Sequence, residues 1–238
     1  MLNKLFGRSQ APAPAAAPAA RTSVPDLTKR AAISLTKHGL SGREAAVYLV
    51  LDRSGSMRPF YKDGTMQYLG ERALGLSRAL DDDGRVQTVF FSSAVDGTSE
   101  LDLDNYAGRI DAAHAQLGHM GTTNYQAAIQ AVIDDYQTSK TSAPAFVLFQ
   151  TDGGPDNQRT AEEALIAAKK LPIFWSFVGF GNRVDFLRTV DDLPGTIDNT
   201  GFFHVPDPHA LSDDALYDGI TAQFGPYLTD AAAQGILR

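Results

Sequence analysis

The sequence has 238 residues, enough for one α/β domain with a sizeable core, and its net charge of −7 and pI near 5.1 argue against nucleic-acid binding by the whole chain. It contains no cysteine, which excludes disulfides, thiolate catalysis and thiolate metal sites. No apolar run approaches the roughly 18 residues that span a bilayer. The basic N-terminus lacks the leucine-rich core of a signal peptide, so we expect a cytoplasmic protein.

Charge is distributed unevenly along the chain, with +6 over residues 1–43 and −13 over the remainder. Residues 9–24 are rich in Ala and Pro and nearly free of large apolar side chains. We therefore predict that residues 1–24 form a disordered basic tail, which folds back loosely on the acidic body. The alternative is a tail that contacts anionic lipid or a partner.

Residues 25–43 are predicted to be a short N-terminal extension of the main domain, which is expected over residues 44–238. The alternation of Ile33 and Leu35 within residues 31–40 favours a short strand added at a sheet edge. Ser41 and Glu44 have the spacing of a capping box, but a strand-like run follows them, so no helix is expected there.

Apolar runs rich in β-branched and aromatic residues predict parallel strands that are covered on both faces. They lie at residues 45–51, 86–91, 144–151 and 173–178, with a final strand at 201–205. Residues 100–103 alternate in polarity and predict an antiparallel edge strand.

Helical periodicity separates most of these strands. Helices are predicted over residues 65–81, 104–116, 124–137, 186–190 and 212–224, and after a capping box formed by Thr160 and Glu163. A kink is expected at Gly225-Pro226. The alternation describes an α/β fold with a doubly wound, mostly parallel sheet, helices on both faces and one antiparallel edge strand.

The strand at 45–51 runs into Asp52-Arg53-Ser54-Gly55-Ser56, which offers one carboxylate and two hydroxyls. These are hard oxygen ligands of the kind that Mg²⁺, Mn²⁺ or Ca²⁺ prefers. Gly55 lets the backbone bend tightly enough for both hydroxyls to face one point. The segment therefore predicts a metal-binding loop.

Two further loops supply oxygen ligands, Gly121-Thr122-Thr123-Asn124 and Thr151-Asp152-Gly153. In a doubly wound sheet, ligands bind in the crevice at the carboxyl ends of the strands. Asp52 and Asp152 both stand at predicted strand ends. We therefore expect a site composed of three loops at one edge of the sheet.

The three loops together resemble the metal-ion-dependent adhesion site (MIDAS) of von Willebrand factor A (vWA) domains. The resemblance implies that Ser54, Ser56 and Thr123 contact the metal by hydroxyls, while Asp52 and Asp152 bind directly or through water. Thr123 is favoured over Thr122 because it stands just before the asparagine.

Charge counting suggests how such a site would work. Two carboxylates leave a divalent centre near neutral, and five side-chain oxygens leave about one octahedral position open for water or a partner's carboxylate. The resemblance implies that this position docks an acidic residue of another protein.

Further stretches resemble the vWA proteins encoded with bacterial tellurite-resistance stress operons, and this resemblance covers about residues 31–235. The stretches are 32–42, 61–65, 81–84, 171–179 and 198–203. The resemblance implies a stress-response protein that works beside calcium-binding and membrane partners of the same system. No spacing indicates tellurite chemistry, and the lack of cysteine argues against thiol reduction of the oxyanion.

The metal loop allows three alternatives. A strand ending in aspartate also occurs in haloacid-dehalogenase phosphotransferases, but these need a second carboxylate two residues on, where this chain has Ser54, so we do not expect an enzyme. In the second alternative the domain has a purely structural or vestigial metal site. In the third, the serines and aspartates only cap backbone groups around turns.

Two further features bear on metal binding, a histidine near the second loop and an acidic run. His119 is close enough in sequence to Thr123 to line the metal cleft. The acidic run Asp81 to Asp83 lacks the spaced ligands of a calcium loop and is expected to be solvated.

Overall fold

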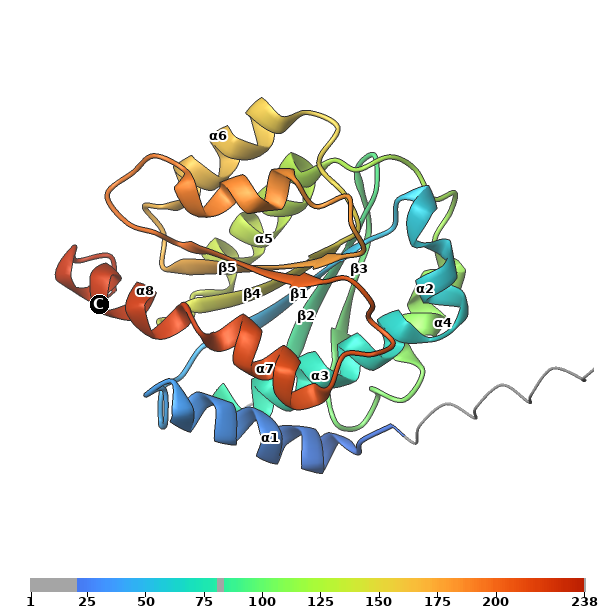
Figure 1. Cartoon of the computed structure of the whole chain (residues 1–238), viewed down its shortest axis with the longest axis horizontal. Coiled ribbons are helices and arrows are strands. Elements are labelled where there is room, and N and C mark those ends of the chain that lie inside the picture. The colour runs from blue at the N-terminus through green and yellow to red at the C-terminus, as the bar shows by residue number, and fades with distance from the viewer. Residues whose placement is uncertain (1–20, 81–83, 238) are drawn as a thin grey trace, which may run out of the picture.

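The computed structural model describes residues 21–80 and 84–237, and in this part of the chain six strands form one sheet with helices on both faces (Figure 1). The strand order is β3-β2-β1-β4-β5-β6, and every neighbouring pair is parallel except β2 and β3. The strands are β1 (Ala46–Asp52), β2 (Val86–Phe91), β3 (Val95–Leu101), β4 (Ala145–Thr151), β5 (Ile173–Phe180) and β6 (Thr200–Val205). The predicted fold class is confirmed.

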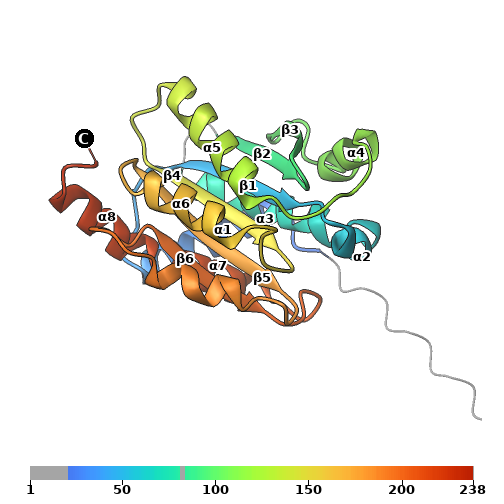
Figure 2. The ribbon, with the colours of Figure 1, turned by 90° about the horizontal axis from the view of Figure 1, so that it is seen from above.

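Helices α5 and α6 cover one face of the sheet, and α1, α3 and α7 cover the other (Figures 1 and 2). The α-helices are α1 (Val24–Lys37), α2 (Arg58–Lys62), α3 (Thr65–Leu80), α4 (Arg109–Gln116), α5 (Tyr125–Ser139), α6 (Gln158–Ala168), α7 (Asp213–Thr221) and α8 (Phe224–Ala233). Two 3₁₀ turns complete the set, η1 (Gly55–Met57) and η2 (Phe186–Asp192).

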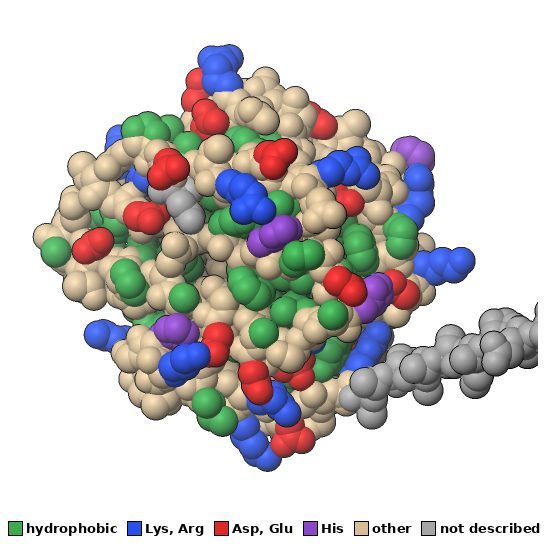
Figure 3. Space-filling model, viewed as in Figure 1, with side chains coloured by type: hydrophobic (Ala, Val, Ile, Leu, Met, Phe, Trp, Pro, Cys, Tyr) green, Lys and Arg blue, Asp and Glu red, His purple; other side chains and the backbone are tan. Residues whose placement is uncertain are grey.

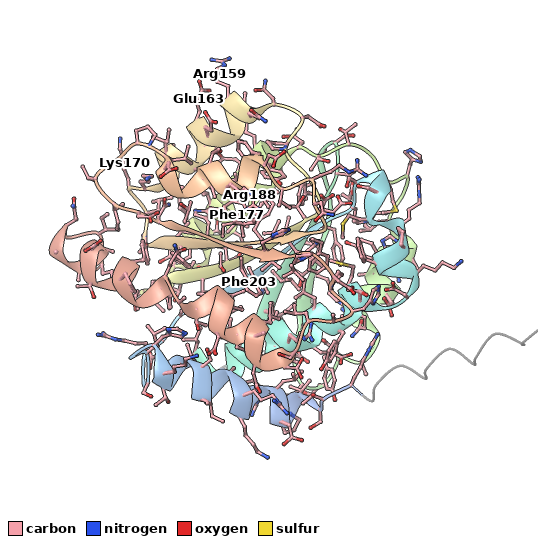
Figure 4. All side chains as sticks on the ribbon, in the orientation of Figure 1. Arg159, Glu163, Lys170, Phe177, Arg188 and Phe203 are labelled. Carbon is pink, nitrogen blue, oxygen red and sulfur yellow. The ribbon has the colours of Figure 1, made fainter. Side chains whose placement is uncertain are left out.

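Successive side chains of each strand enter different hydrophobic cores. In β1, Leu49 packs in the core under α1, α3 and α7, whereas Val50 packs in the core under α5 and α6. Figure 4 shows the same division at β6, where Phe203 lies toward α7 and Arg188 of η2 lies on the other side of the sheet. Gly219 of α7 permits this packing, because a Cβ there would lie 2.3 Å from the Phe203 ring. Both faces of the sheet are thus covered.

The path of the chain places a crevice between β1 and β4. From β1 the chain proceeds outward through β2 to β3, and from β4 it proceeds in the opposite direction through β5 to β6. The connections therefore diverge at the carboxyl ends of β1 and β4, the position where open α/β sheets bind ligands. Asp52 ends β1, and Thr151 ends β4.

The strand predicted within residues 31–40 is wrong, because residues 31–37 belong to helix α1. Ser23 caps the helix by accepting a hydrogen bond from the Asp26 amide, and the helix buries one face. The buried residues have helical spacing and are Val24, Leu27, Ala31, Ser34 and Leu35. Ile33 is 70% exposed, so it lies on the solvent face of the helix and does not share a buried face with Leu35.

Other boundaries also differ from the prediction. Helix α6 is capped by Asn157, whose side chain accepts a hydrogen bond from the Thr160 amide, so the predicted cap at Thr160 is wrong. Helix α4 begins at Arg109 because the preceding residues form a turn around the Asp102 carboxylate. The last helical segment divides between Thr221 and Phe224, ahead of the expected kink.

Two predicted features fall on segments that the structure does not describe. Residues 1–20 of the predicted tail and the acidic run at 81–83 lie outside the described residues. Of the helices within the described ranges, none combines the length and hydrophobicity that crossing a bilayer requires.

Candidate metal centre

Asp52 is the centre of the first loop, and its side chain is fully buried. One carboxylate oxygen accepts a hydrogen bond from the Ser54 amide at 2.5 Å, so the chain turns around the carboxylate directly after β1. The other oxygen accepts a hydrogen bond from the Thr151 hydroxyl at 2.6 Å. Asp52 is therefore held from both strands that border the crevice.

The two serines of the first loop connect Asp52 to the third loop. The hydroxyl oxygens of Ser54 and Ser56 lie 3.1 Å apart, and the Ser56 hydroxyl donates to the Asp152 carboxylate at 2.8 Å. The structure thus brings four of the five predicted ligands together, from the ends of β1 and β4.

The second loop adjoins both of the others. The Gly55 amide donates to the Gly121 carbonyl at 3.1 Å, which joins the first and second loops. The Thr123 amide donates to the Asp156 carboxylate at 3.0 Å, and the Asp156 amide donates to the Thr123 carbonyl at 2.8 Å. The Thr122 hydroxyl donates to the same carboxylate at 2.6 Å, whereas the Thr123 hydroxyl has no hydrogen-bond partner among the described residues.

The buried Asp52 carboxylate lacks a basic partner among the described residues. Burial raises the pKa of the Asp52 carboxyl to about 6; hydrogen bonds from Thr151 and Ser54 oppose this effect, and the charge of Asp152 adds to it. Among the side chains that the structure describes, no Lys or Arg forms an ion pair with Asp52 or Asp152. A bound divalent cation would compensate this buried charge, so the residues fit a hard metal ion.

The donor set also constrains the kind of metal. No group of three or more His, Asp or Glu side chains that could hold a metal occurs in residues 21–80 and 84–237. The centre therefore depends on hydroxyl oxygens beside two carboxylates, a set that suits Mg²⁺, Mn²⁺ or Ca²⁺ better than softer metals.

Arg53 lies between Asp52 and Ser54 in the sequence, but its side chain binds residues outside the predicted ligand set. Its guanidinium forms an ion pair with Asp96 at 2.5 Å and donates to the Gly118 carbonyl at 2.9 Å. Its Nε donates to Nδ1 of His114 at 3.1 Å, and burial together with the Arg53 charge lowers the pKa of His114. Arg53 thus joins the first loop to β3 and to the segment that precedes the second loop.

Two aromatic residues support the same loops. The His114 ring stacks on Tyr61 at 4.0 Å between centroids, and the Tyr61 hydroxyl donates to the Asp52 carbonyl at 3.1 Å. Below the second loop, the Tyr125 hydroxyl donates to the Gly153 carbonyl.

Sequence reasoning missed Thr151, Asp156 and Arg53 as supports of the site. Each adjoins or lies near a predicted ligand, but a single sequence does not reveal which neighbour supplies the hydrogen bond. His119 is exposed, and no described contact joins it to the predicted ligands, so its place in the cleft stays a prediction.

The chain is similar to known proteins over most of its length. A family model described as "vWA found in TerF C terminus" matches residues 44–237. The uncharacterized protein YcbR of Bacillus subtilis (strain 168) is 37% identical over 220 residues, which cover 90% of each chain.

Solved structures share the fold at low identity. A von Willebrand factor type A protein from Catenulispora acidiphila matches with a TM-score of 0.56 and 18% identity over 76% of this chain, which spans 42% of that protein. Manganese-loaded Plasmodium vivax TRAP matches with a TM-score of 0.52 and 18% identity over 74% of both chains. Mussel byssus PTMP1 with a zinc-occupied MIDAS matches with a TM-score of 0.51 and 14% identity, over 76% of this chain and 48% of that chain.

Proposed function

The chain belongs to the family of vWA domains found at the C-terminus of TerF, and on this premise we propose that it binds a protein partner through a divalent cation held in a MIDAS. The cation is Mg²⁺, or Mn²⁺ or Ca²⁺ in its place, and it docks a carboxylate of the partner. The observation that carries this proposal is the buried Asp52 carboxylate, which no described basic side chain neutralises.

The proposed roles follow from where the residues lie. Ser54, Ser56 and Thr123 would hold the metal by hydroxyls, and Asp52 and Asp152 would hold it directly or through water. When bound, the cation supplies a positively charged position that accepts an oxygen ligand from outside the chain. The described contacts of Ser54, Ser56 and Asp152 already gather their oxygens, which supports this assignment.

Two structural neighbours give independent support for metal binding. The Plasmodium vivax protein is manganese-loaded, and the mussel protein has a zinc-occupied MIDAS. Manganese is among the hard ions that the hydroxyl and carboxylate set of this chain favours, whereas zinc is not proposed as its metal.

The burial of Asp52 supports a metal-binding role over a catalytic one. A phosphotransferase aspartate must reach a phosphorus atom as a nucleophile. Asp52 is fully buried, and both of its oxygens accept hydrogen bonds. The same geometry suits a residue that orients a metal through water.

We place this binding in a bacterial tellurite or chemical stress-response system. The family match supports this context, and the partners would be other proteins of the same system that offer a carboxylate. The cytoplasm is the compartment that the cysteine-free sequence favours. Nucleic acid is not proposed as a partner, because the domain is acidic.

Calorimetric titration of the chelated protein with Mg²⁺, Ca²⁺ and Mn²⁺ tests the metal site. The wild type should bind, and the Asp52→Ala, Ser54→Ala double variant should not. Asp230→Ala is the matched control, because it removes an exposed carboxylate on α8, at the other end of the molecule from α2 (Figure 1). Equal binding by the double variant and the wild type would refute the proposed ligands.

The rival is a vWA domain whose metal is only structural. Under the proposal, Asp52→Ala abolishes capture of a metal-dependent partner. Under the rival, the variant loses stability but still binds the partner through another surface. Partner binding in the presence and absence of a chelator therefore distinguishes the two.

A further inference from the structure

We propose that the surface around the predicted metal ligands has a second subsite, at Arg58, which binds an anionic group. The surface would therefore select a partner segment with two neighbouring carboxylates. One carboxylate binds the metal, and the other binds the Arg58 guanidinium. This inference rests on the proposed function and specifies the chemistry of its partner.

The position of Arg58 carries the inference. It is the first residue of α2 and directly follows η1, the turn that contains Ser56. A Cβ placed on Gly55 would have one heavy atom beyond its chain neighbours within 4 Å, the Arg58 Nη1 at 3.6 Å. The guanidinium therefore lies over the short loop whose two serines are the predicted metal ligands.

Arg58 is also available to a partner. Its side chain is exposed, and within the described ranges it forms no ion pair and no hydrogen bond. Arg53 and Arg72, by contrast, are buried and form ion pairs with Asp96 and Asp213. Those two arginines stabilise the fold, whereas Arg58 extends into solvent beside the metal loop.

The charge balance at this end of the molecule favours an acidic partner. Asp52 and Asp152 together neutralise a divalent cation, and Arg58 adds a positive charge beside that nearly neutral centre. Figure 3 shows Lys and Arg side chains extending from the end of the molecule where α2 lies. An acidic segment is thus attracted locally, although the chain as a whole carries a charge of −7.

Guanidinium geometry explains why two carboxylates are needed. A guanidinium binds a carboxylate best through two parallel N–H···O bonds, which use both carboxylate oxygens. A carboxylate that gives one oxygen to the metal has only one oxygen left. Full pairing of Arg58 therefore requires a second acidic side chain next to the first.

The test uses short acetylated and amidated peptides of equal length, one with two adjacent glutamates and one in which the second glutamate is glutamine. Their affinities for the full chain are measured by NMR titration with saturating Mg²⁺ and again with a chelator. The wild type should bind the two-glutamate peptide about 5 to 10 times more tightly than the one-glutamate peptide, in Mg²⁺ only.

Arg58→Gln should abolish this preference without reducing Mg²⁺ affinity, because it removes a positive charge and no ligand. Lys62→Gln is the matched control, since it removes an exposed cation from the same helix, and it should keep the preference. Arg58→Lys should restore part of it, because an ammonium pairs with a carboxylate but not bidentately.

The outcomes separate this inference from the proposed function. If the wild type binds both peptides only in Mg²⁺ and Arg58→Gln keeps the two-glutamate preference, the second subsite is refuted and carboxylate docking stands. If Arg58→Gln and Lys62→Gln lose the two-glutamate preference equally, the subsite is also refuted, because the preference is then a general charge effect. If neither peptide binds although Mg²⁺ does, carboxylate docking fails and the subsite fails with it.

Discussion

The Thr151 hydroxyl donates a 2.6 Å hydrogen bond to the Asp52 carboxylate, across the boundary between β4 and β1. Both side chains are fully buried, and each ends its strand at the point where the connections of the sheet diverge. This contact joins two residues 99 positions apart in the chain. It fixes the acid at the base of the candidate metal centre before any metal binds.

Asp52→Asn should stabilise the metal-free protein while it abolishes Mg²⁺ binding. The buried carboxylate has a raised pKa of about 6, against 3.8 for an unperturbed Asp, so its ionisation opposes folding when no metal is present. At pH 7 the gain should be about 1–3 kcal/mol. Urea unfolding in the presence of a chelator measures it.

The same residue sets an expected pH dependence. Between pH 4 and 6 the folded metal-free protein binds more protons at Asp52 than the unfolded chain does, so stability falls as the pH rises through this window. The stability difference between Asp52→Asn and the wild type should therefore grow from pH 4 to pH 6.5. A constant difference would mean that Asp52 has an ordinary pKa.

Thr151→Val should weaken Mg²⁺ binding and destabilise the fold by about 1–2 kcal/mol. Valine has nearly the same shape as threonine but lacks the hydroxyl that donates to the buried Asp52 carboxylate. Thr151→Ser keeps the hydroxyl and is the matched control. Calorimetry and urea unfolding on both variants check the prediction. An equal loss in the two variants would assign the effect to packing instead of the hydrogen bond.

Asp156→Ala should lower Mg²⁺ affinity roughly 10-fold without removing a predicted ligand, by analogy with other groups that orient metal ligands. Its carboxylate holds the Thr122 hydroxyl and the Thr123 amide, and its own amide binds the Thr123 carbonyl. Loss of the carboxylate frees the loop that presents the Thr123 hydroxyl. Asp230→Ala, which removes an exposed carboxylate on α8, should leave the affinity unchanged, and similar losses in both variants would contradict this role.

Arg53→Met should destabilise the protein by about 2–4 kcal/mol, because it leaves the largely buried Asp96 without its ion-pair partner. Adding Asp96→Asn should recover part of that loss, since the uncompensated charge is then removed. A thermodynamic cycle over the two single variants and the double variant measures the coupling. Additive losses would show that the two side chains do not interact.

The sequence was sufficient to predict the central strands and the ends where the candidate ligands lie. Buried parallel strands are continuous apolar runs, so the strands that end near Asp52 and Asp152 were recognisable without tertiary information. The position of the antiparallel edge strand was also predicted, although β3 begins at Val95, ahead of the expected start.

Helix α1 (Val24–Lys37) is not predictable from residues 31–40 alone. Its apolar face begins at Val24, inside the segment expected to be a tail, so the pattern in residues 31–40 alone suggested alternation. The full spacing from Val24 to Leu35 follows a helical period. The helix packs into the core under α3 and α7, and this tertiary contact stabilises it.

The supporting residues of the site depended on the three-dimensional path of the chain. Nothing in the sequence around Arg53 indicates its partners, and only the fold places Asp96 and His114 beside it. Asp156 lies four residues beyond a predicted ligand, and only the adjacency of its loop to Thr123 reveals its contacts. Such pairings connect distant segments and leave no periodic pattern.

The most direct test of the metal centre is an anomalous-difference map from crystals of the protein soaked in Mn²⁺. The account predicts one strong peak within coordinating distance of the Ser54, Ser56 and Thr123 hydroxyls, with Asp52 and Asp152 bound to it directly or through water. A peak elsewhere, or no peak at saturating Mn²⁺, would contradict the proposed MIDAS.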